Sequence, residues 1–428
     1  MDEQAFSGMV YGVVLNDRAS LAALGEALTH DPYKAPPKAP VLYIKPANTR
    51  FSAKVGAGGT AVLPAGAAGV EIGATLGLVI GRTASKVGAA DAWAHVDGVT
   101  VVADLSLPHE SYYRPAIREK CFDASCALGS KVVPVTDIST LVARTLVDGV
   151  MVAERRFDDL VRDVPQLLAE VTAFMTLCAG DMLLVGVPWR GPQARVGSTV
   201  AVEVDGVERI EFKLASAAAH MPQRGPATVF ALGLNYADHA RELAFKAPDK
   251  PLVFLKGGNT VVGDKAKTVR PADATYMHYE CELAVRIGKA AKGVKRADAM
   301  DHVEAYAVAN DYAIRDYLEN YYRPNLKVKN RDGCTPIGSW VPAVQVADYK
   351  NLALRTNVNG KQTQDGSTRD MIFDIPFLIE YLSEFMTLQP GDIILTGTPE
   401  GLADVKAGDE VITEIEGISR LTNYIVNE

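Results

Sequence analysis

The sequence has few cysteines, and they form no pattern that would pair them or bind zinc. Five cysteines occur in 428 residues, with no CxxC pair and no even disulfide framework, at positions 121, 126, 178, 281 and 334. This favours reduced thiols and a cytoplasmic protein. The first residues, MDEQAFSGMV, are acidic and lack the basic segment and apolar run of a secretory signal.

Long basic tracts and long hydrophobic runs are also missing. The formal net charge is -8, which argues against nucleic acid and anionic membranes as partners. The most apolar-looking stretch, 55–81, is mostly glycine and alanine and is interrupted by Pro64 and Glu71. We therefore expect no membrane span. The sequence contains no GxSxG, Walker or zinc-ligand motif, so those kinds of site are not expected.

What the sequence does contain is one internal repeat. Three segments recur at an offset of roughly 210 residues, which indicates duplicated domains rather than a solenoid of short units. They are 33–49 with 245–260, 111–117 with 320–326, and 174–188 with 385–399. The repeat predicts two similar domains, 1–215 and 216–428, joined within the Ala-, Pro- and Gly-rich segment 215–227.

Each half consists mainly of short β-rich runs bounded by Gly, Pro, Asn or Asp. In the second half these runs include 229–235, 251–257, 279–288, 305–311, 393–399 and 409–417. Helical spacing of apolar residues is confined to a few segments, such as 164–177 and 375–388. We expect a mainly β fold of the α+β class, with sheets around a core and peripheral helices.

The run HYECELAVRIG (278–288) places two glutamates in an otherwise apolar strand. Because side chains alternate along a strand, Glu280 and Glu282 share one face and lie about 6–7 Å apart. The next strand, AYAVAND, ends in Asp311. Three carboxylates without clustered His or Cys suit a hard divalent ion, with Mg²⁺ the best fit and Mn²⁺ an alternative. An isolated ExE is more often a solvated strand face.

The first half departs from this pattern. The repeat aligns Glu280 with Gly73 and Glu282 with Thr75, whereas Asp311 aligns with Asp104. A solvated strand face would plausibly keep charged residues in both halves. The asymmetry therefore predicts that only the second repeat binds a metal.

Candidate catalytic residues lie in two segments before the glutamates. His239 and Glu242 are spaced i, i+3 in NYADHARE, so on a helix they could form a hydrogen-bonded general base. A surface helical pair is the alternative. Lys256 ends an apolar strand and could hold an anionic substrate; Lys45 occupies its place in the first half, which favours a structural role.

Candidate substrate-binding residues follow the glutamates. The segment 315–331 has five basic residues, including Arg323 and Arg331, and could attract a di- or tricarboxylate. A charged surface loop is the alternative. Thr396 and Thr398 lie at a strand end in TGTP, where their hydroxyls could bind a carboxylate, although threonine is also an ordinary strand former.

Taken in order, NYADHARE, FLK, YECEL, the ND at 310–311 and TGTP resemble the fumarylacetoacetate hydrolase family. The resemblance covers essentially the whole chain. It implies two tandem copies of a mixed β-sandwich roll, and a metal held by Glu280, Glu282 and Asp311. It also implies that His239 and Glu242 lie on a lid, with Lys256 and Lys329 near a bound oxo acid.

The duplication, together with DYAIRDYLENYYRPNLKVKNRDG (311–333), resembles members of this family that work in 4-hydroxyphenylacetate (homoprotocatechuate) catabolism. The implied activity is decarboxylation of 5-oxopent-3-ene-1,2,5-tricarboxylate, followed by isomerisation of 2-hydroxyhepta-2,4-dienedioate to 2-oxohept-ene-dioate. Three alternatives stay open: an acylpyruvate-type C–C hydrolase, a non-catalytic oxo-acid binding protein and a purely structural duplicate. A monomer of two repeats and a homo-oligomer are both compatible with the duplication.

Overall fold

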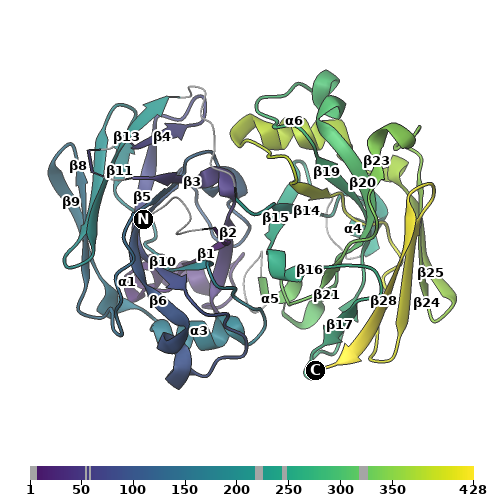
Figure 1. The fold of residues 1–428 in the computed structure, drawn as a ribbon, viewed down its shortest axis with the longest axis horizontal. Helices are drawn as coiled ribbons and strands as arrows, with labels where there is room; N and C mark the ends of the chain where they lie inside the picture. The colour runs from purple at the N-terminus through teal and green to yellow at the C-terminus, as the bar shows by residue number, and fades with distance from the viewer. Residues whose placement is uncertain (1–6, 54, 57–58, 217–224, 243–247, 318–325) are drawn as a thin grey trace. The chain divides into compact units, whose positions relative to one another are not determined.

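The computed structural model describes residues 7–53, 55–56, 59–216, 225–242, 248–317 and 326–428, and Figure 1 shows its ribbon. The chain divides into two compact units, with a boundary in the sequence between Pro226 and Ala227. The expected linker, 215–227, includes residues 217–224, which lie outside the described residues. The expected limits of 1–215 and 216–428 stay a prediction.

The first unit contains two sheets. The larger has the order β2-β1-β10-β5-β6-β7-β3, with β11 also paired to β5, and the smaller has the order β4-β13-β12-β8-β9. The strands of the larger sheet are β1 (Val10–Val14), β2 (Val41–Lys45), β3 (Arg50–Ser52), β5 (Gly69–Ile80), β6 (Val96–Ser106), β7 (Cys126–Leu128), β10 (Met182–Val187) and β11 (Gln193–Arg195). Those of the smaller sheet are β4 (Gly59–Leu63), β8 (Val142–Val147), β9 (Val150–Arg156), β12 (Thr199–Val204) and β13 (Glu208–Ser216).

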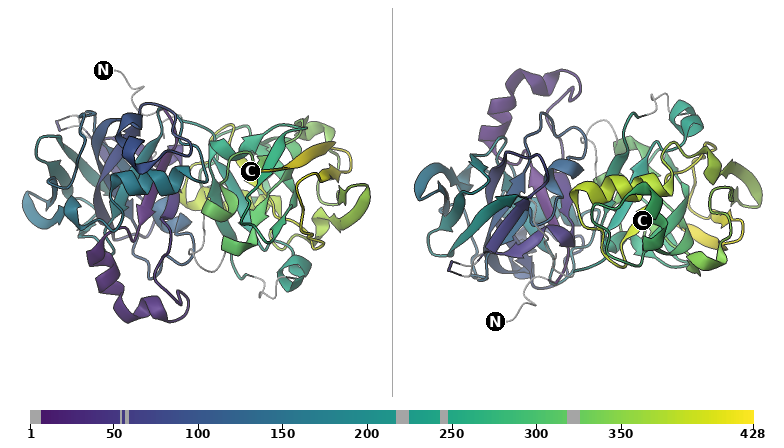
Figure 2. Two further views of the ribbon diagram at one scale, coloured as in Figure 1. Left: turned by 90° about the horizontal axis from the view of Figure 1, so that it is seen from below. Right: turned by 90° about the horizontal axis from the view of Figure 1, so that it is seen from above.

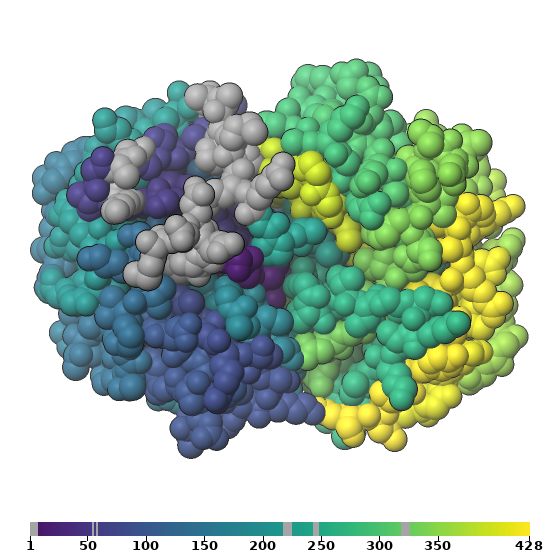
Figure 3. Space-filling view, viewed as in Figure 1, coloured from purple at the N-terminus to yellow at the C-terminus, as the bar shows by residue number. Residues whose placement is uncertain are grey.

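The second unit repeats this arrangement. Its larger sheet has the order β15-β14-β26-β19-β20-β23 and its smaller one β17-β28-β27-β24-β25, and two short pairs, β16-β22 and β18-β21, flank them. The larger sheet comprises β14 (Val229–Gly233), β15 (Leu252–Lys256), β19 (Cys281–Ile287), β20 (Val303–Asn310), β23 (Val341–Pro342) and β26 (Ile393–Leu395). The other strands are β16 (Val261–Val262), β17 (Lys267–Arg270), β18 (Met277–His278), β21 (Ala313–Ile314), β22 (Thr335–Pro336), β24 (Ala353–Val358), β25 (Lys361–Ser367), β27 (Glu410–Ile415) and β28 (Ser419–Asn427). Figure 3 shows β28 and its neighbours, in yellow, at the surface of this unit.

The described helices are few and short, as expected for this class of fold. They are α1 (Arg18–Leu24), α2 (Ile117–Lys120), α3 (Val164–Thr172), α4 (Ala237–Glu242), α5 (Leu326–Lys329) and α6 (Ile375–Phe385). α3 and α6 begin in the same way, because the carboxylates of Asp163 and Asp374 accept hydrogen bonds from the backbone N–H three residues on. Figure 2 shows α1, in purple, projecting from the body of the first unit. No α-helix in the described ranges is both long and apolar enough to cross a membrane.

The central strands are buried on both faces. In β5 every residue after Gly69 is buried, and in β19 only Arg286 is partly exposed. Strands covered on both faces become nearly continuous apolar runs, which explains the sequence of 71–80. In the second unit, Ala284 of β19 and Ala307 and Ala309 of β20 form part of one core cluster. Charged side chains at the start of β19 are therefore held in a rigid, largely dry environment.

A buried aspartate fixes the same corner in both units. Asp392 accepts hydrogen bonds from the N–H of Thr228 (2.8 Å), before β14, and of Gln389 (2.7 Å), in the turn before β26. Asp181 accepts the equivalent pair from Met9 and Cys178 in the first unit. Burial raises the pKa of Asp392 to about 7, although the two backbone donors oppose this shift.

This pKa shift predicts a pH-dependent stability. Between the unfolded pKa near 4 and the folded pKa near 7, the folded chain binds the extra proton, so stability decreases as the pH rises through that window. We expect the melting temperature to fall between pH 5 and pH 8 by about 4–8 °C more in the wild type than in Asp392→Asn, which corresponds to roughly 2 kcal/mol.

Differential scanning calorimetry at both pH values measures this difference. Asp301→Asn, which removes an exposed carboxylate, is the matched control and should change with pH as the wild type does. Equal pH dependence in Asp392→Asn and the wild type would show that Asp392 does not titrate in this range.

Candidate metal centre

The two glutamates take their positions from the pairing of β19 with β20. These strands are antiparallel, with Cys281 opposite Asn310 and Glu282 opposite Ala309. Glu280 lies just before β19; its N–H donates to the side chain of Asn310 (3.0 Å) and its C=O accepts from the N–H of Asp311 (2.9 Å). This pairing brings Asp311, at the end of β20, beside the start of β19.

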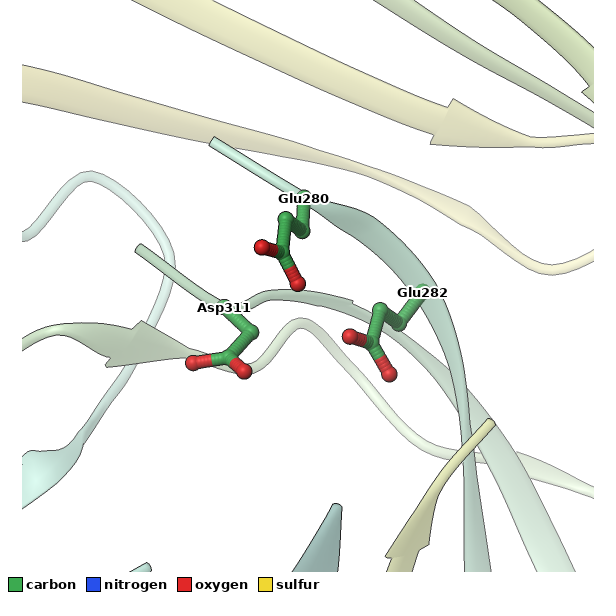
Figure 4. A group of neighbouring side chains, drawn as sticks. All are labelled: Glu280, Glu282 and Asp311. Carbon is green, nitrogen blue, oxygen red and sulfur yellow. The ribbon is translucent and has the colours of Figure 1, made fainter. Parts of the chain in front are cut away.

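The carboxylates of Glu280, Glu282 and Asp311 converge, as Figure 4 shows. One oxygen of each lies within 4.8 Å of an oxygen of the others. Glu282 and Asp311 are fully buried, and Glu280 is 9% exposed. Convergent buried carboxylates repel one another unless cations lie among them, and carboxylate oxygens are the ligands that Mg²⁺ and Mn²⁺ prefer. The predicted set of residues therefore fits a divalent ion.

Two lysines supply part of the compensating charge. The ammonium of Lys256 contacts Asp311 Oδ1 at 2.5 Å and also donates to the carbonyl of Lys329. Lys329 Nζ lies 2.7 Å from both Glu280 Oε2 and Asp311 Oδ2. Burial lowers the pKa of Lys329, but Asp311 and the two glutamates outweigh this effect and raise it, so this lysine stays charged.

Glu282 is the least compensated of the three carboxylates. Its Oε2 accepts a hydrogen bond from the N–H of Gly397 (2.6 Å), whereas its Oε1 is buried without a partner among the described residues. Burial, Asp311 and Glu280 raise its pKa well above the ordinary value; Lys329 and the Gly397 N–H oppose the shift. A buried, unpartnered carboxylate oxygen facing two other carboxylates is the expected state of a ligand for a cation.

The structure also forms the predicted pair of His239 and Glu242 on α4. His239 Nδ1 lies 3.1 Å from Glu242 Oε2, and His239 is only 4% exposed. The other oxygen of Glu242 accepts from the N–H groups of Gly401 and Leu402, each at 3.1 Å. This fixes the carboxylate and hence the imidazole. The expected lid includes residues 243–247, which lie outside the described residues.

Buried His278 lies beside the carboxylate of Glu280. His278 Nδ1 is 3.6 Å from Glu280 Oε1. Burial, followed by the charges of Lys329, Arg315 and His239, lowers the pKa of His278. His278 is therefore neutral and packs within electrostatic reach of both groups.

The two threonines of TGTP have different surroundings. The Thr396 hydroxyl donates to the carbonyl of Leu283 (2.9 Å), so it stabilises the junction of β26 and β19. The Thr398 hydroxyl accepts from Gln364 Nε2 (2.8 Å). Both residues are buried. The expected strand over 393–399 is shorter in the structure, since β26 ends at Leu395.

The basic segment 315–331 places fewer basic side chains beside the three carboxylates, among the described residues, than its sequence suggests. Arg331 Nη2 lies 3.6 Å from Glu428 Oε1, and Arg331 forms no ion pair with the three carboxylates within the described ranges. Arg323 belongs to residues 318–325, which lie outside the described residues. In this segment, Lys329 is the residue that the structure brings to the carboxylates.

In the first unit, the same place retains its aspartate but not the glutamates. Asp104 Oδ1 pairs with Lys45 (2.8 Å) and Oδ2 with Lys120 (2.6 Å), and Tyr43 donates to Oδ2 at 2.5 Å. The two lysine ammonium groups and the Tyr43 hydroxyl thus all contact the Asp104 carboxylate. Thr75, aligned with Glu282, bonds to the Gly186 carbonyl (2.5 Å). This arrangement offers one carboxylate, already paired, and no carboxylate cluster among the described residues.

Two contributors were missed from the sequence. The backbone N–H of Gly397, which has a φ of 86°, holds Glu282. The side chain of Asn310 holds the backbone of Glu280. A glycine before TP and an asparagine before Asp311 were visible signals, but backbone donors cannot be located without the tertiary structure.

Comparison with known proteins identifies the class to which this fold and site belong. The family described as fumarylacetoacetate (FAA) hydrolase C-terminal matches twice, over residues 9–215 and 228–426. The chain therefore belongs to the fumarylacetoacetate hydrolase family, and its two sheets per unit form two tandem copies of the family fold.

Individual relatives and one solved structure differ in how much of this chain they match. The chain is 48% identical to the 4-hydroxyphenylacetate degradation bifunctional isomerase/decarboxylase of Escherichia coli, over 98% of this chain and 99% of that protein. It is also 48% identical to the protein of that name from Salmonella dublin over the same shares. The mitochondrial oxaloacetate tautomerase of Bos taurus is 40% identical, over 44% of this chain and 87% of that protein. A crystal structure of fumarylpyruvate hydrolase from Pseudomonas aeruginosa with Mn²⁺ and pyruvate matches 48% of this chain and 91% of its own, at 33% identity and a TM-score of 0.45.

The unequal carboxylate sets predict one metal ion per chain. Titration of the chelator-treated protein with Mg²⁺ or Mn²⁺ in a calorimeter should give a stoichiometry near one. Outer-shell changes at metal sites already cost about 10–100-fold in affinity, so loss of a charged ligand in Glu282→Gln should cost about 100-fold or more.

Glu71→Gln is the matched control, because Glu71 is a buried glutamate on β5 of the first unit. It should leave metal affinity within about twofold of the wild type. Two ions per chain, or equal losses in both variants, would contradict the assignment of the site to the second unit.

Proposed function

We propose that the chain decarboxylates 5-oxopent-3-ene-1,2,5-tricarboxylate and isomerises 2-hydroxyhepta-2,4-dienedioate to 2-oxohept-ene-dioate in 4-hydroxyphenylacetate catabolism, and that it acts in the cytoplasm. The observation that carries this proposal is 48% identity to the E. coli isomerase/decarboxylase over nearly the full length of both chains. The convergence of Glu280, Glu282 and Asp311 supports it. We assign both reactions to the second unit.

The three carboxylates would hold a divalent ion, Mg²⁺ or alternatively Mn²⁺. Such an ion supplies a Lewis acid for the negative charge that develops on an oxo acid. The chain keeps these ligands in place through rigid contacts: Lys256 fixes Asp311, and the Gly397 N–H fixes Glu282. Lys256 is completely buried, so its position favours holding Asp311 over touching the substrate.

Lys329 is the candidate for direct charge stabilisation. It is partly exposed, at 15% of its side chain, and contacts both Glu280 and Asp311. When the C–C bond to the leaving carboxylate breaks, CO₂ departs and its electron pair stays on the conjugated chain, ending near the oxo oxygen. A fixed ammonium beside that oxygen lowers the barrier without reorganisation.

His239 is the candidate proton carrier. The decarboxylated chain must gain a proton on carbon, and the isomerisation must remove the enol O–H proton and add one at a different carbon. His239 can do both, because Glu242 orients its imidazole through Nδ1 and leaves Nε2 as the exchanging atom. A shared delocalised intermediate lets one site catalyse both steps.

The remaining partners follow from the same chemistry. The substrate is a small di- or tricarboxylate oxo acid, for which Lys329 and the basic segment, including Arg331 and Arg323, supply positive charge. Thr398, held by Gln364, is the threonine of TGTP whose hydroxyl is not committed to a backbone carbonyl as a donor. We assign it, rather than Thr396, to carboxylate binding.

A CO₂-release assay with ultraviolet detection tests the reaction class. Chelator-treated protein should be inactive towards the tricarboxylate, and added Mg²⁺ should restore both CO₂ release and the spectral change. Glu282→Gln should lower kcat/KM by about 100-fold or more because the ligand set is broken, whereas Glu71→Gln should retain activity. Metal-dependent formation of two acids without CO₂ would favour a C–C hydrolase, and no turnover would favour a binding protein.

Proton transfer is tested separately with the dienol substrate. Positioned general acid/base groups contribute about 10²–10⁴-fold, so His239→Gln should reduce the isomerisation kcat by that factor while metal affinity is unchanged. His302→Gln is the control, because His302 lies in a 3-10 helix and its imidazole bonds only to the Lys289 carbonyl among the described residues. An undiminished kcat in His239→Gln would assign proton transfer to another group.

A further inference from the structure

The first unit contains a cavity that the proposed chemistry does not use. Its volume is about 490 Å³, and it lies against β5, β8, β9 and the segment after β10. Its apolar lining includes Ile72, Ala74, Pro188 and Pro192. This volume is within the range of small-molecule sites. Ile72 and Ala74 point to the opposite face of β5 from Gly73 and Thr75, so the cavity is distinct from the place that corresponds to the metal centre.

Comparison of the two repeats explains why the cavity exists. Asp17 of the first unit corresponds to Tyr236 of the second, since each follows an asparagine and a leucine with positive φ. The ring of Tyr236 is fully buried. Replacing this aromatic side chain with Asp17 removes most of its volume.

A second replacement enlarges the same space. Ala153 on β9 corresponds to Gln364 on β25. Gln364 is buried and donates to Thr398 Oγ1 and to the Pro399 carbonyl, both at 2.8 Å. Ala153 lacks the volume of a glutamine side chain and its two hydrogen bonds. Ala153 instead lines the cavity.

Two polar side chains that line the cavity each have one unpartnered atom. Asp17 is 4% exposed; its Oδ1 accepts from the Ser20 N–H (2.7 Å), but its Oδ2 is buried without a partner in the described parts of the chain. Arg155 uses Nη1 for the carbonyls of Ala74 (2.9 Å) and Gly186 (2.6 Å), whereas its Nη2 is likewise buried and unsatisfied. Leaving a buried charged donor and a buried charged acceptor without hydrogen bonds is costly. A ligand that carries both an acceptor and a donor would satisfy the two atoms.

The charge of Arg155 is only distantly balanced. Burial lowers its pKa, and the carboxylates of Asp17 and Asp159 raise it without either forming an ion pair with it among the described contacts. Asp159 already accepts from the Ala19 N–H (2.9 Å). Position 155 corresponds to Gly366 in the second unit, so this partly buried cation has no counterpart at that position of the second repeat.

A second cation at the cavity can take another negative group. Arg190 lines it and lies over the ring of Trp189, 5.5 Å from the centroid. The third lining arginine, Arg156, is already paired with Asp158 (2.9 Å). Arg155, Arg190 and the buried Asp17 therefore line the same space, together with Glu154, Asp159 and the paired Arg156 and Asp158.

We propose that the first repeat binds a small dicarboxylate that carries a hydroxyl or ammonium group beside one carboxylate. One carboxylate accepts from Arg155, the neighbouring donor group bonds to Asp17 Oδ2, and the second carboxylate pairs with Arg190. The repeat without the metal ligands is thus a second ligand-binding site rather than a scaffold alone.

Calorimetric titration of the full chain with malate, aspartate and succinate, in the presence of EDTA, tests this proposal. Malate and aspartate present the hydroxyl and the ammonium group, and succinate presents neither. We expect malate or aspartate to bind in the sub-millimolar range, and the stronger of the two identifies the donor group. Succinate should bind at least about tenfold more weakly, because a hydrogen bond to a buried charge is worth about 1.5–3 kcal/mol.

Ala153→Gln copies the residue of the second repeat and should fill the cavity without disturbing the contacts of Arg155 and Asp17. It should weaken binding at least about tenfold, because the ligand would lose the space in which it forms its hydrogen bonds to Arg155 and Asp17. Arg155→Met should weaken it similarly. Val152→Gln is the matched control, because Val152 is the exposed neighbour on β9, and it should bind as the wild type does.

Three results would overturn the proposal. They are no binding of malate or aspartate at 10 mM (roughly the weak limit of specific binding), equal binding of succinate, and undiminished binding in Ala153→Gln. The last would place the ligand elsewhere on the chain. Because the titration is done without metal and measures no turnover, its outcome is separate from that of the proposed reaction.

Discussion

A buried ion pair between a lysine and an aspartate is the interaction around which both units are organised. It joins Lys256 to Asp311 in one unit and Lys45 to Asp104 in the other, and all four side chains are at most 1% exposed. Such a pair stabilises a fold only when its remaining hydrogen-bonding groups are satisfied. In both units they are: Lys256 also donates to a backbone carbonyl, and Lys45 donates to two carbonyls and a hydroxyl. The pair links β15 to the end of β20 in one unit and β2 to β6 in the other, although these strands are not adjacent in the order of their sheets.

The two glutamates are an addition to this arrangement, and charge explains how it can be tolerated. In the second unit three carboxylates face two lysines, which leaves one negative charge. A divalent ion would reverse the sign to one positive charge. In the first unit one carboxylate faces Lys45 and Lys120, which gives one positive charge without a metal. Adding two glutamates and one divalent ion therefore does not change the net charge of the directly paired groups. The same framework can exist in both forms.

The sequence predicted the fold class and the convergence of Glu280, Glu282 and Asp311 because the evidence for both is local or repeated. Alternation along 278–288 placed Glu280 and Glu282 on one face, and the repeat showed which half retained them. The spacing of His239 and Glu242 predicted their contact. The family resemblance, rather than any pattern, placed Lys329 near the site. Interactions that depend on backbone groups from distant strands, such as the Gly397 N–H on Glu282, have no signature in residue type. The pairing of Arg331 with Glu428 shows the same limit, because one sequence segment can direct its charges to different neighbours.

One short loop connects the two kinds of chemistry in the second unit. The N–H of Gly397 holds a metal-ligand candidate, and the N–H groups of Gly401 and Leu402 hold the carboxylate that orients His239. The separation between Glu282 and the pair of His239 and Glu242 is therefore set by a few consecutive peptide units. In the proposed reaction, this loop therefore sets the separation between the oxo group and the carbon that receives the proton. A change in the length of this loop would change that separation and, with it, the length of the carbon chain that fits the proposed site.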